Sequence, residues 1–237
     1  MDRYEDVALM VDHSLLRPQL TRAEVTAGLE LAKRYGVAAA TVRPCDIDLA
    51  VQALAGTAIQ PGSVVGFPHG SPTTATKLFE TRDLLDRGAR EIDMVIAISR
   101  LLSGDLDYVQ AELDRMAELC HRHSAILKVI FENAYLTDEF KILACQCCGK
   151  AGVDFVKTST GFAPSGYTVA DLKLMRQHTL AHIAVKAASG LKTLDQVLEV
   201  RALGVTRVGL TSTAAVLDEW KSRVAGQAVS NQLSALS

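Results

Sequence analysis

Residues 21–42 read TRAEVTAGLELAKRYGVAAATV and carry the signals of a helix followed directly by a strand. Thr21 and Glu24 form a capping box, which marks a helix start, and Gly36 supplies the typical stop. The apolar residues between these signals recur at helical spacing, at Val25, Leu29 and Ala32. The run Ala38–Val42 follows at once and predicts a strand, so the stretch predicts one complete helix–strand unit.

The same unit recurs along the chain. Eight short apolar runs predict strands, at Ala8–Val11, Ala38–Val42, Val64–Phe67, Ile92–Ile96, Ile126–Phe131, Phe155–Thr158, Ile183–Ala187 and Val205–Leu210. Helix signals separate them, including a second capping box at Thr193 and Gln196. Such alternation implies parallel strands joined by right-handed crossovers, and eight units close a barrel. We therefore predict an α/β fold, a single-domain (β/α)8 TIM barrel over residues 1–225, with a polar, frayed tail over 226–237.

An open doubly wound sheet is the rival architecture. Sheets of that type that bind dinucleotides carry a Gly-x-Gly-x-x-Gly turn after the first strand. Here the first strand leads into Asp12-His13-Ser14-Leu15-Leu16 instead. The sequence thus favours the barrel and contains no cofactor motif.

Composition excludes several classes of function. The 237 residues are 49% hydrophobic and 22% charged, which suits a globular core and not a disordered chain. The net charge of −2 and the lack of like-charged blocks argue against a nucleic-acid partner. No signal peptide or membrane span is evident, so we expect a cytoplasmic protein without a membrane partner.

The five cysteines include three, Cys145, Cys147 and Cys148, in one expected helix. Zinc sites normally need two spaced ligand pairs, and no second pair is present. We expect buried, reduced thiols that pack as small apolar groups.

Three ionisable residues stand inside apolar strands: Asp93, Lys157 and Lys186. Burying an ammonium without compensation costs several kcal/mol, so two lysines on neighbouring strands need a reason. A nearby like charge and desolvation both lower the pKa of a lysine, which leaves one free amine near pH 7. A free amine attacks carbonyls and forms an iminium, while Asp93 relays protons. The alternative is that the three are salt-bridged core residues and nothing more.

Further motifs accompany these residues along the chain: Asp12-His13-Ser14-Leu15-Leu16, Val65-Gly66-Phe67-Pro68-His69-Gly70, Lys77 with Glu80, Glu91-Ile92-Asp93-Met94-Val95, Leu127-Lys128-Val129-Ile130, Phe155-Val156-Lys157-Thr158-Ser159-Thr160-Gly161-Phe162 and Val185-Lys186-Ala187. By these motifs the chain resembles the deoxyribose-phosphate aldolase family almost from end to end. The resemblance implies that Lys157 forms the Schiff base, that Lys186 perturbs its pKa, and that Asp93 shuttles protons. It also implies acetaldehyde and glyceraldehyde 3-phosphate as products, no metal, no organic cofactor and a homodimer.

Other matching residues carry weaker expectations. Asp12 and Lys128 fit the polar network around the site, and a buried ion pair that only orders strands fits equally well. Lys77 and Glu80 have i,i+3 spacing, for which we expect a solvated surface pair. We expect His69 to be a hydrogen-bonded loop residue and not a catalytic one.

Two loops depart from the resemblance, which implies backbone N–H groups that hold the substrate phosphate after strands seven and eight. The first reads Ala187-Ala188-Ser189-Gly190 in place of Ala-Ser-Gly-Gly, and in the second Thr213 follows Gly209-Leu210-Thr211-Ser212 where glycine is usual. A β-branched residue at a position that needs positive φ is costly, so the second loop is either reshaped or does not do the same job.

The second strand also departs, because Thr41-Val42-Arg43-Pro44 stands in place of Cys-Val-Asn-Pro. We expect Arg43 to present a guanidinium at the barrel mouth, suited to phosphate or carboxylate. The expected substrate-binding residues are Asp12, Thr41, Arg43, Lys128, Thr158, Ser189, Gly190, Gly209, Thr211 and Ser212.

Three functions remain open at this point. The first is reversible cleavage of 2-deoxyribose 5-phosphate. The second is a Schiff-base aldolase for another sugar, non-phosphorylated or carboxylated, which the altered loops favour. The third is a non-catalytic barrel that binds sugar phosphates, although a pure binder gains nothing from a pair of buried cations.

Overall fold

Eight parallel strands form a closed barrel in the computed structural model, which describes residues 3–234. Each strand pairs with the next in chain order, and β8 returns to pair with β1. The strands are β1 (Val11–Leu15), β2 (Ala39–Val42), β3 (Gln60–Val65), β4 (Glu91–Val95), β5 (Ile126–Ile130), β6 (Phe155–Lys157), β7 (Ala184–Ala188) and β8 (Arg207–Leu210). The predicted (β/α)8 barrel is confirmed.

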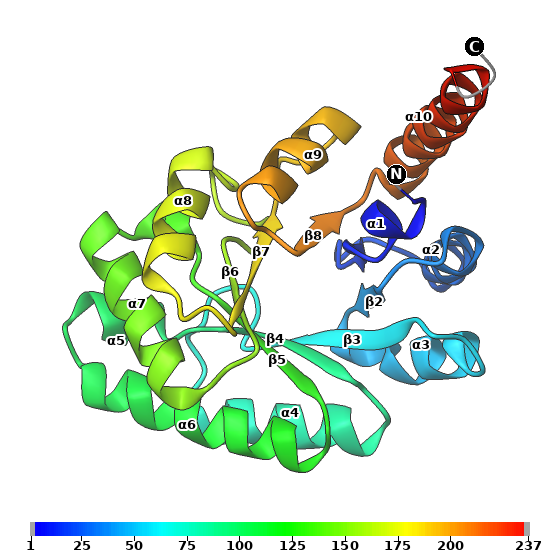
Figure 1. The fold of residues 1–237 in the computed structure, drawn as a ribbon. Helices are drawn as coiled ribbons and strands as arrows, with labels where there is room; N and C mark the ends of the chain where they lie inside the picture. Colours follow the sequence, from blue (N-terminus) through cyan, green and yellow to red (C-terminus); the bar gives the residue numbers. More distant parts are fainter. Residues whose placement is uncertain (1–2, 235–237) are drawn as a thin grey trace.

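Helices surround the strands on the outside of the barrel (Figure 1). They are α1 (Glu5–Ala8), α2 (Arg22–Tyr35), α3 (Ile47–Leu54), α4 (Thr74–Asp86), α5 (Ile98–Leu102), α6 (Leu106–Arg122), α7 (Asp138–Ala151), α8 (Val169–His178), α9 (Leu194–Ala202) and α10 (Thr213–Ser234), with short 3-10 turns at Pro44–Asp46 and Asn133–Tyr135. Helix α10 packs beside α1, α2 and α9 and projects from the barrel. None of the described helices is long and apolar enough to cross a membrane.

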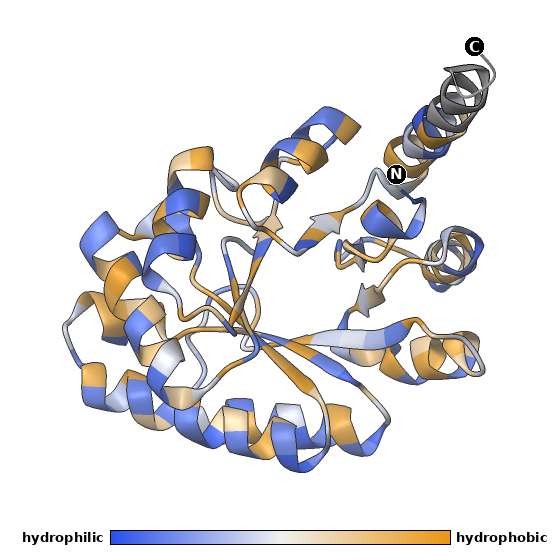
Figure 2. Ribbon diagram, in the orientation of Figure 1, coloured by the Kyte–Doolittle hydropathy of each residue, from blue (hydrophilic) through white to orange (hydrophobic). Residues whose placement is uncertain are grey.

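Local sequence signals fix the helix ends as expected. Both capping boxes are present, Thr21 with Glu24 before α2 and Thr193 with Gln196 before α9. Gly36 ends α2 at φ 59°, in the left-handed region that glycine occupies without a steric penalty. Hydrophilic and hydrophobic bands alternate along α4 and α6, since one side of each helix covers the barrel (Figure 2).

The first strand lies further along the chain than predicted. Ala8 belongs to α1, and β1 begins at Val11 and carries Asp12, His13 and Ser14. The prediction was wrong because it required apolar residues, whereas these polar side chains lie on a strand that contributes to the site. The third strand ends at Val65, since Gly66 turns the chain at φ 60°.

The expected start of the polar tail falls inside a helix. Residue 226 lies within α10, so the helix continues past the expected start of a tail. Residues 235–237 of that tail lie outside the described residues.

The cysteine prediction is confirmed for the three thiols of α7. Cys145, Cys147 and Cys148 are buried, unbonded to one another, and packed in the main hydrophobic core. Burial raises the pKa of each thiol, that of Cys145 to about 11, so they stay protonated.

Candidate active site

A cavity of about 200 Å³ opens at the carboxyl ends of the strands. Its walls come from the carboxyl ends of β1, β6, β7 and β8 and from the segments that follow them: Ser14, Leu16, Arg17, Lys157, Thr160, Gly161, Phe162, Ala188, Ser189, Gly190, Leu191, Lys192, Gly209, Leu210 and Thr211. This is the end of a barrel at which active sites form.

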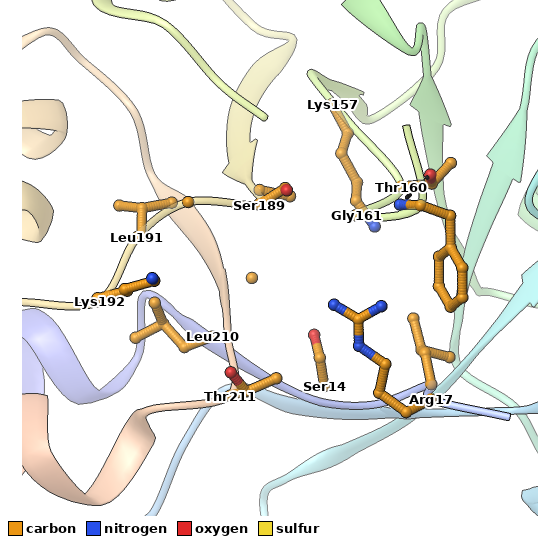
Figure 3. A pocket seen from close by; sticks show the side chains of 15 residues that line it. Ser14, Arg17, Lys157, Thr160, Gly161, Ser189, Leu191, Lys192, Leu210 and Thr211 are labelled. Carbon is orange, nitrogen blue, oxygen red and sulfur yellow. Dashed lines mark hydrogen bonds between the residues drawn. The ribbon is translucent and has the colours of Figure 1, made fainter. Parts of the chain in front are cut away.

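Lys157 is the last residue of β6, and its amine enters the cavity (Figure 3). The side chain is only 4% exposed. Its Nζ donates a hydrogen bond to Asp93 Oδ2 at 2.6 Å. Lys157 therefore combines a desolvated amine with access for a small molecule.

Lys186 lies directly beside Lys157 in the register of β6 and β7. Its Nζ donates to the same oxygen, Asp93 Oδ2, at 2.8 Å, and also to Asp12 Oδ2. The two ammonium groups thus share one carboxylate oxygen, which confirms the predicted proximity. Lys186 is 1% exposed and does not line the cavity.

Asp93 joins the two lysines to a third. Lys128 Nζ lies 3.2 Å from Asp93 Oδ1 and donates to Asp12 Oδ2 at 2.6 Å. Asp93 Oδ1 is buried and accepts no hydrogen bond from the described residues, so it has lone pairs available for a proton.

The network extends below the cavity to two residues that the sequence analysis missed. Arg207 donates to both oxygens of Glu91 and to Asp12 Oδ1, and Glu91 also accepts from Lys128. Both residues stand at strand starts that read as ordinary surface positions, although the alternation along β4 places Glu91 on the same face as Asp93.

The buried network holds more positive than negative groups. It contains four cations (Lys128, Lys157, Lys186 and Arg207) and three carboxylates (Asp12, Glu91 and Asp93). Full ionisation leaves one surplus positive charge in a desolvated site, where uncompensated charge is costly. The network becomes neutral when one lysine loses its proton.

The pKa shifts follow this arrangement. Burial, the largest influence, lowers the pKa of Lys186 to about 8, and the ammonium groups of Lys128 and Lys157 act in the same direction. Burial alone would lower the pKa of Lys128 as well, but the surrounding carboxylates raise it above its usual value. Lys186 is accordingly a group that can change its charge near physiological pH, and Lys128 is a fixed cation.

The neighbouring lysines favour the charged form of Asp93. Burial would raise the pKa of its carboxyl, but the three neighbouring lysines lower it well below its usual value. The carboxylate can therefore accept a proton only when one of these cations has lost its own charge.

Positive backbone φ angles occur in the loop after β7 and not at Thr213. Ser189 has φ 67° and Gly190 has φ 103°, both in the left-handed region. Thr213 is instead the first residue of α10, and its hydroxyl contacts His13 Nδ1 at 2.9 Å. Thr213 does not need a positive φ because it begins a helix, so the steric cost considered for this position does not arise.

Comparison with known proteins identifies the family. A family model described as "DeoC/LacD family aldolase" matches residues 7–212. The chain belongs to this aldolase family. The deoxyribose-phosphate aldolase of Rhodopirellula baltica is 45% identical over 96% of this chain and 94% of its own length. That of Thermoanaerobacter sp. strain X514 is 42% identical over 91% of this chain and 97% of its own length.

A solved structure of the same kind agrees with the fold. The deoxyribose phosphate aldolase of Aeropyrum pernix, described as a unique tetramer, superposes with a TM-score of 0.83 at 29% identity and covers 93% of each chain. The predicted family resemblance is therefore confirmed.

Arg43 does not take the place expected of it in this aldolase. Its guanidinium binds Asp46 at 2.7 Å and the carbonyl oxygens of Arg17 and Pro18, and it does not line the cavity. The prediction for Arg43 was wrong because the turn after β2 brings Asp46 within reach. Thr41 is buried and likewise does not line the cavity.

Some of the remaining expected binding residues line the cavity, and the others do not. Ser189, Gly190, Gly209 and Thr211 line the cavity. Thr158 instead joins β6 to β7 through its hydroxyl, which contacts the backbone of Ala188. Ser212 precedes α10, and its Oγ is buried without a hydrogen-bond partner among the described residues. Asp12 and Lys128 belong to the charged network below the cavity.

Lys77 and Glu80 do not form the surface pair expected from their spacing. Lys77 is fully buried, and its Nζ donates to Glu112 Oε1 at 2.7 Å and to the carbonyl of Val95 at 2.8 Å. Glu80 accepts instead from the backbone N–H of Gly66 at 2.8 Å. The i,i+3 rule failed here because α4 turns Lys77 toward α6 and the barrel. His69 is exposed in the loop after β3 and lies outside the cavity.

Three further features of this aldolase had no clear sequence signal. Glu132 is buried and accepts from the backbone N–H and the hydroxyl of Thr160, which positions one cavity wall. Arg17 and Lys192 contribute cations to the cavity mouth. Both lie in loops, where the sequence does not distinguish a functional basic residue from an ordinary surface residue.

Proposed function

We propose that this chain is a class I aldolase that reversibly cleaves 2-deoxyribose 5-phosphate to acetaldehyde and glyceraldehyde 3-phosphate through a Schiff base on Lys157. The single observation that carries the assignment of Lys157 is its position: it shares Asp93 Oδ2 with Lys186 and faces the cavity, whereas Lys186 does not. Family membership supports the aldolase reaction, and the charged network supports the nucleophile.

The amine becomes available through proton exchange across Asp93. Lys186 has a pKa of about 8 and loses its proton readily because of burial. When Lys186 is neutral, the proton of Lys157 can pass to it through Asp93 Oδ2, which contacts both nitrogens. Lys157 is then a free amine beside the cavity, and the network as a whole is neutral.

The free amine attacks the aldehyde carbon C1 of the open-chain sugar. The resulting carbinolamine takes a proton on its hydroxyl, loses water and leaves a protonated imine on Lys157. Asp93, the carboxylate that contacts Nζ, carries the protons that these steps move. Its proton affinity rises at this stage, because the free amine of Lys157 no longer contributes a positive charge.

Cleavage then follows from the charge on the imine nitrogen. A base removes the proton of the C3 hydroxyl, the C2–C3 bond breaks, and its electron pair forms an enamine. Glyceraldehyde 3-phosphate leaves as an aldehyde. Protonation of the enamine at C2 and addition of water release acetaldehyde and restore the amine, so no metal or organic cofactor takes part.

Reductive trapping tests the assignment. Borohydride with acetaldehyde should place an ethyl group on Lys157, located by peptide mass mapping, and should abolish cleavage of 2-deoxyribose 5-phosphate. Lys77 is an internal control, because it is buried away from the cavity and should stay unmodified. An active enzyme with its adduct on Lys186, or with no adduct, would contradict the role of Lys157.

The assembly and the location are part of the same proposal. The enzyme is a cytoplasmic homodimer, as the family resemblance predicts. Sedimentation equilibrium of the purified chain tests the dimer, and a tetramer, as described for the Aeropyrum pernix enzyme, would contradict it.

A further inference from the structure

Arg17 lies at the cavity mouth with its guanidinium on an aromatic ring. It follows β1, and its Cζ is 5.1 Å from the centre of the Phe162 ring. Phe162 is itself held by Phe67, whose ring meets it edge to face at 5.3 Å between centroids. Figure 3 shows the Arg17 guanidinium directed into the cavity from the side opposite Lys157. The contact with Phe162 thus limits where this long side chain can point.

The guanidinium of Arg17 has no counter-charge of its own. Within residues 3–234 it forms no hydrogen bond or ion pair, although Arg43 nearby is bound to Asp46 and two carbonyl oxygens. The donors of Arg17 are therefore available to a ligand.

The cavity as a whole is positively charged. Its lining includes the cations Arg17 and Lys192, together with Lys157, whose amine is bound to Asp93 beneath the cavity, and contains no aspartate or glutamate. This contrasts with the network beneath it, in which each cation contacts a carboxylate. A cavity with free cations and no carboxylate favours an anionic ligand.

The opposite wall offers a weaker hold on an anion. The loop after β7 contributes Ser189, at φ 67°, and Lys192, and the segment after β8 contributes the hydroxyl of Thr211. Lys192 offers an ammonium point charge and no planar fork of donors. A side-chain cation is needed to match the full charge of a phosphate, and guanidinium geometry suits its oxygens.

We propose that Arg17, fixed on the face of Phe162, binds the phosphate of the substrate and makes this enzyme select phosphorylated over plain sugars. The inference rests on the proposed function and names the specificity determinant of the same site. It also relocates to Arg17 the role that the sequence analysis gave to Arg43.

Steady-state cleavage of 2-deoxyribose 5-phosphate and of plain 2-deoxyribose by Arg17→Ala tests this inference. We expect kcat/KM for the phosphorylated sugar to fall about 10- to 100-fold, mostly through KM, because a charged hydrogen bond is lost. The value for the plain sugar should stay within about twofold of the parent enzyme, since the reacting groups are untouched. Arg17→Lys should recover part of the loss, because an ammonium keeps the charge but not the bidentate geometry.

Arg22→Ala is the matched control. Arg22 is an exposed cation at the start of α2, and it does not line the cavity. Its removal should leave both substrates unaffected. Equal losses on both substrates in Arg17→Ala would assign Arg17 a structural role and overturn the inference, and so would no loss on either.

A binding measurement separates this inference from the proposed function. Calorimetric titration with inorganic phosphate should show binding to the parent protein and at least tenfold weaker binding to Arg17→Ala. If the parent enzyme cleaves no sugar but phosphate binding still depends on Arg17, the proposed function fails and the anion site stands. If cleavage occurs and phosphate binds both proteins equally, the anion site fails alone.

Discussion

Two buried lysines, Lys77 and Lys157, have the same immediate contact and different surroundings. Each donates to a carboxylate oxygen, at 2.7 Å for Lys77 and 2.6 Å for Lys157. Lys77 has Glu112 as its own partner and is sealed between α4, α6 and the end of β4. Lys157 shares Asp93 with two other lysines and opens on a cavity.

Under the proposed mechanism, burial alone does not make a lysine reactive. In a one-to-one pair such as Lys77–Glu112 the two opposite charges balance, so no surplus charge remains. The network around Lys157 has one cation too many, so it favours loss of a proton, and its cavity admits a carbonyl compound. A surplus of positive charge and access to a substrate together distinguish the candidate nucleophile from the structural lysine.

Replacing the candidate nucleophile should produce the largest effect on activity. Lys157→Met should lower kcat/KM for 2-deoxyribose 5-phosphate by about 10⁴-fold or more, as loss of a covalent nucleophile does in other enzymes. Its free energy of unfolding should change by less than about 1 kcal/mol, because the surplus cation is removed and Asp93 keeps two partners. Kinetic assays and urea denaturation measure the two quantities.

Lys173→Met is the control for that experiment, since Lys173 is exposed on α8. A Lys157→Met protein that retains activity, or one that unfolds, would show that Lys157 resembles Lys77 after all.

Removing the structural lysine should have the opposite consequences. Lys77→Met leaves Glu112 charged and buried, which should cost about 3–5 kcal/mol of unfolding free energy. The activity of the folded fraction should stay within a few-fold of the parent enzyme. The double variant Lys77→Met with Glu112→Leu should regain most of the stability, because it leaves no unpaired charge. A Lys77→Met protein as stable as the parent would contradict the structural role of Lys77.

The pH dependence of kcat/KM should follow the protonation of Lys186. Below pH 8 Lys186 becomes protonated, because burial lowers its pKa only to about 8, and the free amine on Lys157 becomes scarcer. We therefore expect kcat/KM to rise with pH, by up to about tenfold per unit below this pKa, and to level off above it. The rising limb near pH 8 should be absent in Lys186→Met, whatever activity remains. A profile that falls between pH 6 and 8 would contradict the scheme.

Replacing Arg207 should shift the acid side of the pH dependence of kcat/KM by a smaller amount. Arg207→Gln removes one cation from the network, which leaves more of the Asp12 charge for Lys186 and raises the pKa of that lysine. The acid limb of kcat/KM should shift upward, by about one pH unit or less. A downward shift would show that Arg207 acts through packing against Phe155, near which its guanidinium lies at 5.7 Å.

The sequence analysis found the lysines of the network but not all of its charges. Asp93, Lys157 and Lys186 were evident because ionisable residues inside apolar strands are conspicuous. Glu91 and Arg207 were missed because they stand at strand starts, beside residues that normally reach solvent. Only closure of the barrel, which places β8 against β1, brings Arg207 to Asp12, 195 residues away.

The loops were the least predictable part. Arg43 and Thr213 were each assigned from the local residue type, yet Arg43 found Asp46 and Thr213 became the first residue of a helix. Arg17 had no signal at all, since a lone arginine in a loop gains meaning only from the ring beneath it and the cavity beside it.

The sequence by itself determined the order of strands and helices, the closure at eight units and the three ionisable residues at the centre. Those features depend on local periodicity and on the high cost of burying charge, and both leave a mark on neighbouring residues in the chain. The tertiary structure decided which lysine faces the cavity, which cations share a carboxylate and which arginine lines the cavity. Those outcomes depend on distances of a few ångströms between residues far apart in sequence, and the balance of charge in a buried site is set only when they meet.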